Sequence, residues 1–135
     1  MNAVFADTFY FVALLNERDA AHVQAASLRR SLRQPLVTTE WVLAETGGAL
    51  SAVHLRAGFV RLARILQAAG PDAVIVPATS EMFRAGLDLY ASRPDKEWSL
   101  TDCISFAVMQ DLGLKDALTG DHHFTQAGFN VLLKG

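Results

Sequence analysis

Short apolar runs alternate with longer segments of helical periodicity along the whole chain. "AVFAD" at residues 3–7 predicts a first strand. Further strands are predicted at "PLVTT" (35–39), "AVIVPA" (73–78), "DALTG" (116–120) and "NVLL" (130–133). Between the strands, apolar residues at helical spacing predict helices over residues 8–16, 20–33, 40–53, 54–70, 80–92 and 100–112, with a short helical turn after residue 121.

This order of elements predicts an α/β fold with a mostly parallel sheet. The strands are continuously apolar rather than alternating, which is typical of strands covered by helices on both faces. The pattern contains no internal repeat, low-complexity segment or linker. We therefore expect the 135 residues to form a single domain, residues 1–135.

Composition narrows the class of protein. Hydrophobic residues make up 51% of the chain, enough for a core, which argues against intrinsic disorder. The longest apolar run, Phe9 to Leu15, is far shorter than the roughly 20 residues of a membrane-spanning helix. No leader peptide is evident at the N-terminus, and the single Cys103 excludes an internal disulfide. We expect Cys103 to be a small buried residue and the protein to be cytoplasmic, without a membrane partner.

The net charge of −2 and the pI near 6.0 argue against binding of nucleic acid through overall positive charge. Lysine and arginine supply most non-specific affinity for phosphates, and this chain has no surplus of either. Any nucleic-acid function must therefore use a local patch or a bound cation.

Two acidic residues follow predicted strands. Asp7 closes "AVFAD" and Asp121 follows "ALTG". In open α/β sheets, ligands bind outside the carboxyl ends of the strands, so both positions are candidate site residues. The alternative is that each aspartate caps the next helix by accepting backbone N–H hydrogen bonds.

Glu45 is a third candidate because its helical position is unusual. With Trp41 at zero on a helical wheel, Glu45 falls at about 40°, between Ala52 at about 20° and Ala49 at about 80°. This places Glu45 in an apolar stripe, where a carboxylate needs a partner. A neutral, protonated glutamate is the alternative.

Asp102 is the fourth candidate, in "WSLTDCISFAVM". Phe106 lies about 40° away and Met109 about 20° away on the other side, while the opposite face is also apolar, which predicts a helix buried nearly all round. The alternative is a capping box, with Ser99 as N-cap and Asp102 three residues later. A capping box is compatible with a ligand role, since one carboxylate oxygen can still face a cation.

Several carboxylates at one sheet edge repel one another and have raised pKa values until a cation joins them. Oxygen ligands suit Mg²⁺ or Mn²⁺ rather than zinc. A divalent cation also explains how an acidic protein can attract a phosphodiester.

With these four acids located, the chain resembles the PIN-domain family, and within it the small VapC-like ribonuclease toxins. The similarity rests on a first strand ending in Asp7-Thr8, on Glu45 in "TTEWVLAET", on Asp102 in "WSLTDCISFAVM", and on Asp121 in "LTGDHHFTQAGFNVL". The resemblance implies a three-layer fold with a parallel five-stranded sheet flanked by helices. It also implies a Mg²⁺- or Mn²⁺-dependent endonuclease that cuts RNA, homodimers, and an antitoxin partner.

The mechanistic hypothesis is metal-assisted hydrolysis of RNA. Asp7 and Asp102 are the main ligands, Glu45 and Asp121 complete the acidic cluster, and one or two ions are possible. Thr8 and Thr101 are supporting candidates that orient the carboxylates or a phosphate, with helix capping as the alternative.

Other polar residues are weaker candidates. His122 and His123 stand where family members often carry a further acidic or polar residue, which leaves the number of metal ions open. We expect both to be helix-start or rim residues, with at most one of them touching a phosphate. Two arginine groups form either phosphate tracks or solvated faces: Arg29, Arg30 and Arg33, and Arg56, Arg61 and Arg64.

Three alternative functions are considered, and the sequence argues against the second and third. The first is a catalytically weak PIN module that acts as an RNA-binding or regulatory partner. The second, a doubly wound phosphatase, requires a second aspartate two residues after the nucleophile, and "ADTFY" around Asp7 lacks one. The third, a zinc hydrolase, requires better-spaced ligands than the four histidines provide.

Overall fold

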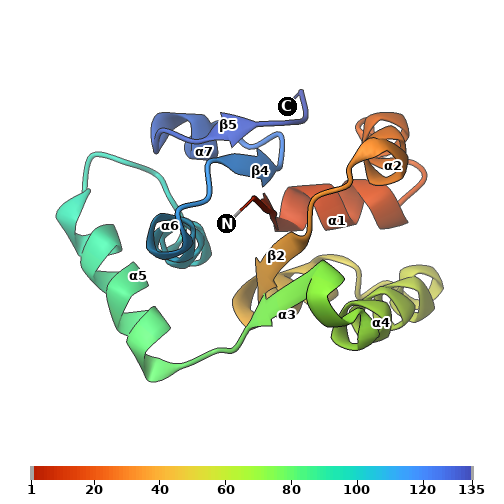
Figure 1. The fold of residues 1–135 in the computed structure, drawn as a ribbon, viewed down its shortest axis with the longest axis horizontal. Helices are drawn as coiled ribbons and strands as arrows, with labels where there is room; N and C mark the ends of the chain where they lie inside the picture. The colour runs from red at the N-terminus through yellow and green to blue at the C-terminus, as the bar shows by residue number, and fades with distance from the viewer. Residues whose placement is uncertain (1, 135) are drawn as a thin grey trace.

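The structure, a computed structural model, describes residues 2–134, and its five strands form one sheet (Figure 1). The strands are β1 (Val4–Ala6), β2 (Leu36–Thr39), β3 (Ala73–Val76), β4 (Asp116–Leu118) and β5 (Asn130–Val131). The α-helices are α1 (Thr8–Leu15), α2 (His22–Ser31), α3 (Glu40–Ala49), α4 (Val53–Ala68), α5 (Ser80–Ser92), α6 (Leu100–Leu112) and α7 (His122–Gln126), and Gly70–Asp72 form a 3-10 turn, η1.

The strand order is β3-β2-β1-β4-β5, and every neighbouring pair is parallel. The expected three-layer α/β fold is confirmed, with a sheet that is fully rather than mostly parallel. In Figure 1, α5 and α6 lie on one side of the strands, and α1, α2 and α4 lie on the other. Ala6 of β1 pairs with Leu118 of β4, so both strands end at the same edge of the sheet. Residues just after these two strands are therefore neighbours.

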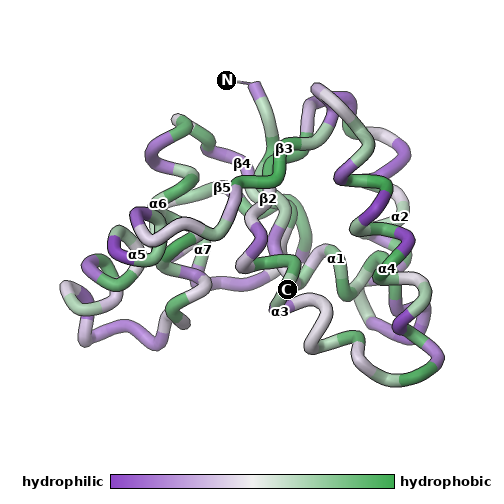
Figure 2. The backbone as a smooth tube through the Cα atoms, turned by 90° about the horizontal axis from the view of Figure 1, so that it is seen from below, coloured by the Kyte–Doolittle hydropathy of each residue, from purple (hydrophilic) through white to green (hydrophobic). Residues whose placement is uncertain are grey.

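Aromatic side chains join the sheet to the helices around this edge. Phe124 of α7 is fully buried and packs edge-on against Phe106 of α6, with ring centroids 4.9 Å apart. Trp98 packs against the same Phe106 at 5.1 Å and donates its indole N–H to the side-chain oxygen Oε1 of Gln126 at 3.0 Å. In Figure 2, hydrophobic backbone runs through the central strands, whereas the outer helices alternate between hydrophilic and hydrophobic turns. These contacts fix α7 and the start of α6 relative to each other.

Helix α6 is the most buried helix, as its sequence predicts, with Cys103 among its fully covered residues. It packs closely on α5 because Gly86 has no side chain. A Cβ at Gly86 would overlap the side chain of Ile104 and lie 3.0 Å from its Cα. No helix within residues 2–134 is long and apolar enough to cross a membrane.

The helix predicted over residues 40–53 is wrong at its C-terminal end. Helix α3 ends at Ala49 and the chain turns before α4 begins at Val53. Without Ala52 in the helix, the predicted apolar stripe loses one of its members. The residues of α3 that are buried are Val42 and Thr46, which define a different inward face.

Candidate active site

Asp7 lies directly after β1 and is almost fully buried, with 4% of its surface exposed. Its backbone N–H donates to the Leu118 carbonyl at 3.2 Å, and its Oδ2 accepts a hydrogen bond from the Thr119 hydroxyl at 3.0 Å. Asp7 occupies the N-cap position of α1, but its side chain makes no capping hydrogen bond. The capping alternative therefore does not account for this carboxyl group.

The surroundings of Asp7 raise its pKa to about 7. Burial is the largest cause, because a carboxylate is less well solvated inside the protein than in water. The nearby charges of Asp102 and, more weakly, Glu45 raise the pKa further. Hydrogen bonds from the Thr8 backbone and the Thr119 hydroxyl act in the opposite direction. The Asp7 carboxyl group therefore lies close to the other acids and accepts few hydrogen bonds that would stabilise its charge.

Asp102 is buried at the third position of α6 and completes a capping box. Its backbone N–H donates to the Ser99 hydroxyl at 2.9 Å, and its Oδ2 accepts from the Ser99 N–H at 3.2 Å. Burial raises the pKa of Asp102, and the charge of Asp121 adds to the rise, against hydrogen bonds from Ser99 and His123. The capping-box interpretation is correct, and the same carboxylate also lies in the acidic cluster.

Asp121 is the N-cap of α7, since its Oδ1 accepts the His123 N–H at 2.9 Å. Its own N–H donates to the Thr119 hydroxyl at 3.1 Å. Thr119 therefore contacts Asp7 and Asp121 at once, and it is fully buried. Thr119 was not among the predicted site residues. Its only signal in the sequence is a hydroxyl residue near the end of the predicted strand 116–120, two positions before Asp121.

The predicted burial of Glu45 is wrong, because Glu45 is exposed. The inward face of α3 carries Val42 and Thr46, and Glu45 lies beside that face. Its charge nevertheless adds, as the smallest of the causes, to the raised pKa of Asp7. The Thr46 hydroxyl donates to the Val42 carbonyl at 2.8 Å, and its oxygen lies 3.5 Å from the Thr8 hydroxyl oxygen, so this turn of α3 contacts the start of α1.

The two supporting threonines have different surroundings. The Thr8 hydroxyl donates to the Val42 carbonyl at 3.4 Å, so its side chain serves the contact between α1 and α3. Thr101 is half-buried beside Asp102, and its supporting role stays a prediction.

The two histidines differ sharply. The His122 side chain is 74% exposed, and its Nδ1 lies 3.7 Å from Asp121 Oδ1, beyond hydrogen-bonding distance. The His123 side chain is 20% exposed, and its Nδ1 lies 3.1 Å from Asp102 Oδ2 and 3.4 Å from Asp121 Oδ1. Both residues begin α7, as expected. His123 is not a rim residue, however, because its ring lies between two of the four acids.

The donor set fits a hard divalent cation. Burial and mutual repulsion disfavour the charged forms of Asp7 and Asp102, and a cation placed among the carboxylates would relieve both effects. Asp121, His122 and His123 form a second possible donor set, with ligand atoms within 4.8 Å of one another. One carboxylate and two imidazoles would favour a softer transition metal. The carboxylate set is the better match, because it includes the two buried acids, Asp7 after β1 and Asp102 in α6.

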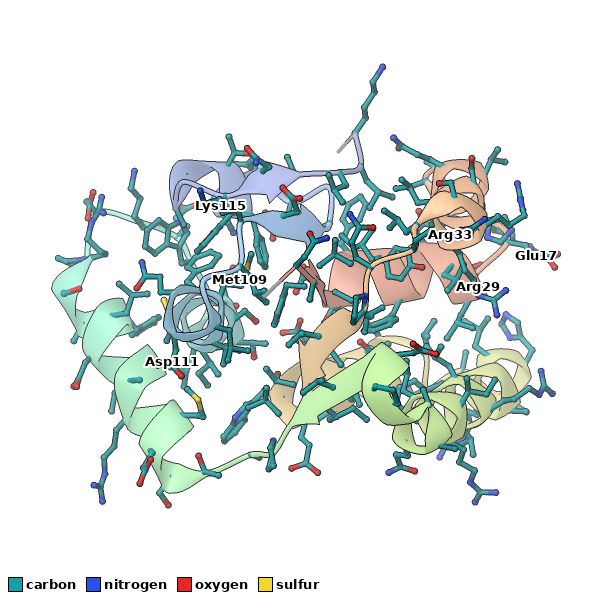
Figure 3. The ribbon with its side chains drawn as sticks, in the orientation of Figure 1. Glu17, Arg29, Arg33, Met109, Asp111 and Lys115 are labelled. Carbon is teal, nitrogen blue, oxygen red and sulfur yellow. The ribbon has the colours of Figure 1, made fainter. Side chains whose placement is uncertain are left out.

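The first arginine group lies apart from these acids. Figure 3 shows Arg29 of α2, and Arg33 just after α2, at the opposite side of the molecule from α6. Arg56, Arg61 and Arg64 line a surface hollow on α4. The acidic cluster is therefore not bordered by the arginines of α2.

Comparisons with known proteins cover nearly the whole chain. The chain is 28% identical over 131 residues to the 23S rRNA-specific endonuclease VapC20 of Mycobacterium tuberculosis, across 93% of this chain and 95% of that protein. The crystal structure of VapC20, described as a sarcin-ricin loop cleaving toxin, matches with a TM-score of 0.86, covering 96% of this chain and 98% of that one.

More distant structures share the fold. FitAcB from Neisseria gonorrhoeae matches at a TM-score of 0.66 and 18% identity, covering 95% of each chain. VapBC2 from Rickettsia felis, bound to a DNA fragment from its promoter, matches at 0.65 and 11% identity, covering 96% of each chain. The PIN domain model matches residues 4–130, which includes all four acids. The chain therefore belongs to the PIN domain family.

Proposed function

We propose that this protein is a divalent-metal-dependent endoribonuclease and the toxin of a toxin–antitoxin pair. The observation that carries the proposal is that three acids meet at the carboxyl edge of the sheet: Thr119 contacts both Asp7 and Asp121, and His123 contacts both Asp102 and Asp121. The charge of Glu45 adds to the raised pKa of Asp7. The similarity to VapC20, a protein described as an rRNA endonuclease, supports RNA as the substrate.

Mg²⁺ or Mn²⁺ at this site would supply a bound water of lowered pKa and offset negative charge on the phosphate. The protein residues hold the carboxylates in place for that ion. Thr119 anchors one oxygen of Asp7, and Ser99 anchors one oxygen of Asp102. Asp121 is fixed by its contact with the start of α7. Glu45 is exposed, and its role in this proposal is to bind or orient water at the open side of the cluster.

The test is cleavage of purified 23S rRNA and of total RNA with Mg²⁺ or Mn²⁺, with the new 5′ ends mapped. We expect Asp7→Asn and Asp102→Asn to lower the rate at least about 100-fold, since each removes a charged ligand from the cation site. Asp88→Asn on the exposed surface of α5 is the matched control and should cleave like the wild type. RNA binding without cleavage by the wild type would instead support a catalytically weak RNA-binding module.

An antitoxin partner is the second part of the proposal. Helix α4 leaves Val60 and Ile65 exposed in the hollow lined by its arginines, a surface suited to an acidic amphipathic segment. The charge-reversed pair Arg61→Glu and Arg64→Glu should then lose its antitoxin in co-purification while retaining RNA cleavage. Retention of the antitoxin by this variant would refute the placement.

Homodimerisation is the third part of the proposal. Phe83, Leu87 and Tyr90 are 38%, 43% and 50% exposed, and their spacing puts them along one side of α5. Phe83 also packs against Trp41 of α3, with ring centroids 5.9 Å apart. Contiguous exposed apolar side chains of this kind mark protein contact sites. Light scattering should give the mass of a dimer for the wild type and of a monomer for Leu87→Asp.

A further inference from the structure

His123 contacts two of the candidate metal ligands, and these arrive from different helices. Its ring Nδ1 lies 3.1 Å from Asp102 Oδ2, at the start of α6. Its backbone N–H donates to Asp121 Oδ1 at 2.9 Å, at the start of α7. One residue therefore spans the distance between the two carboxylates.

The two oxygens of Asp102 are used unequally. Oδ2 accepts from the Ser99 N–H at 3.2 Å and contacts His123 Nδ1 at 3.1 Å. Oδ1 takes part in none of the hydrogen bonds formed within residues 2–134. An ionised carboxylate only accepts hydrogen bonds, so the contact with His123 requires a proton on Nδ1. The two donors together set the plane of the carboxylate and leave Oδ1 free.

The ring of His123 is itself held in place. The next residue, Phe124, is fully buried and packs between Phe5 and Phe106, with ring centroids 6.4 Å and 4.9 Å away. Gln126 accepts the indole N–H of Trp98, just before the start of α6. The orientation of His123 toward Asp102 is thus built from the packing of α7 rather than from a flexible surface side chain.

We propose that His123 is a positioning residue, whose Nδ1–H fixes Asp102 so that the second oxygen of this carboxylate faces the divalent ion. The inference rests on the proposed metal-dependent function and adds a residue to it. Groups that hydrogen-bond metal ligands from behind typically change metal affinity 10- to 100-fold when they are removed. His122, which is exposed and makes no such contact, has no part in this role.

The test is calorimetric titration of Mn²⁺ and, separately, Mg²⁺ into the metal-free protein, so that no activity measurement is needed. We expect His123→Leu to weaken the binding of both ions about 10- to 100-fold. His123→Asn should stay close to the wild type, because asparagine carries an N–H donor at the position of Nδ1. His54→Leu, at an exposed histidine of α4, is the matched control and should bind both ions like the wild type.

The outcomes separate the possible roles. Unchanged affinity in His123→Leu would overturn the inference while leaving the metal site intact. A loss confined to Mn²⁺, with Mg²⁺ unchanged, would overturn it in favour of His123 as a direct ligand, because imidazole contributes more to transition-metal binding. A wild type that binds neither ion would overturn the proposed function itself. If His123→Leu fails to fold, His123→Gln replaces it. The glutamine amide lies one methylene farther from the backbone than Nδ1 and so cannot donate to Asp102 from the same position. Wild-type affinity in His123→Gln would also refute the role.

Discussion

Replacing Asp7 by asparagine should stabilise the metal-free protein at neutral and higher pH. The carboxyl group is buried, and its pKa is raised from 3.8 to about 7. Asparagine has nearly the same shape, carries no charge and keeps an oxygen that can accept the Thr119 hydroxyl. The substitution therefore removes the cost of the buried charge while retaining the main hydrogen bond.

The sign of the pH dependence follows from the raised pKa. The folded state holds the Asp7 proton more tightly than the unfolded state, so the free energy of unfolding falls as pH rises from about 4 to about 7. At 1.36 kcal/mol per pKa unit, the rise from 3.8 to about 7 corresponds to about 4 kcal/mol above pH 7. Below pH 4 the group is protonated in both states and the effect vanishes. We therefore expect Asp7→Asn to gain about 2–4 kcal/mol at pH 8 and close to nothing at pH 4.

The assay is urea denaturation at pH 4, 6 and 8 with chelator present, in which unfolding is monitored by circular dichroism. Asp88→Asn is the control for a generic loss of negative charge, because Asp88 is exposed on α5. Mg²⁺ at 100 times its dissociation constant should stabilise the wild type by about 2.7 kcal/mol and so remove most of the advantage of Asp7→Asn. A loss of stability in Asp7→Asn at pH 8 without metal would refute the reasoning. A gain in stability at pH 4 as large as the gain at pH 8 would refute it as well.

Four further substitutions test the contacts of the site and the packing of α5 on α6 by urea denaturation. Thr119→Val should cost about 1–3 kcal/mol, because it leaves the buried Asp7 oxygen without its donor, and no loss would contradict that contact. Ser99→Ala should cost about 1 kcal/mol through the lost N-cap of α6, and a neutral result would mean the capping box contributes nothing. Gly86→Ala should destabilise the protein by about 1–3 kcal/mol, because the new methyl group would overlap with Ile104. Gly48→Ala, which has open space around it, should stabilise the protein by about 0.5–1 kcal/mol. Equal effects of the two substitutions would refute the close contact between α5 and α6.

Sequence reasoning located the fold and the strand-end acids because both depend on regular patterns. Continuous apolar strands require a covered parallel sheet, and parallel strands bring their carboxyl ends to one edge, where Asp7 and Asp121 lie. The capping box at Asp102 was also visible, since its residues are only three apart.

The errors and omissions have physical causes. The helical wheel for Glu45 assumed one continuous helix through Ala52, but the chain leaves the helix after Ala49, and the inward face follows Val42. The role of Thr119 depends on the register between β1 and β4, which pairs Ala6 with Leu118 across more than a hundred residues. The direction of a side chain on a five-residue helix depends on how that helix packs, so periodicity gave no information on His123.

The central claim is that the four carboxylates form a divalent-cation site for RNA cleavage. The most direct measurement is metal removal and restoration in an RNA cleavage assay, with wild type and the Asp7→Asn, Asp102→Asn double variant at equal concentration. We predict that chelator abolishes cleavage by the wild type, that excess Mn²⁺ or Mg²⁺ restores it, and that neither ion restores the double variant. Full cleavage in excess chelator, or by the double variant, would contradict the account.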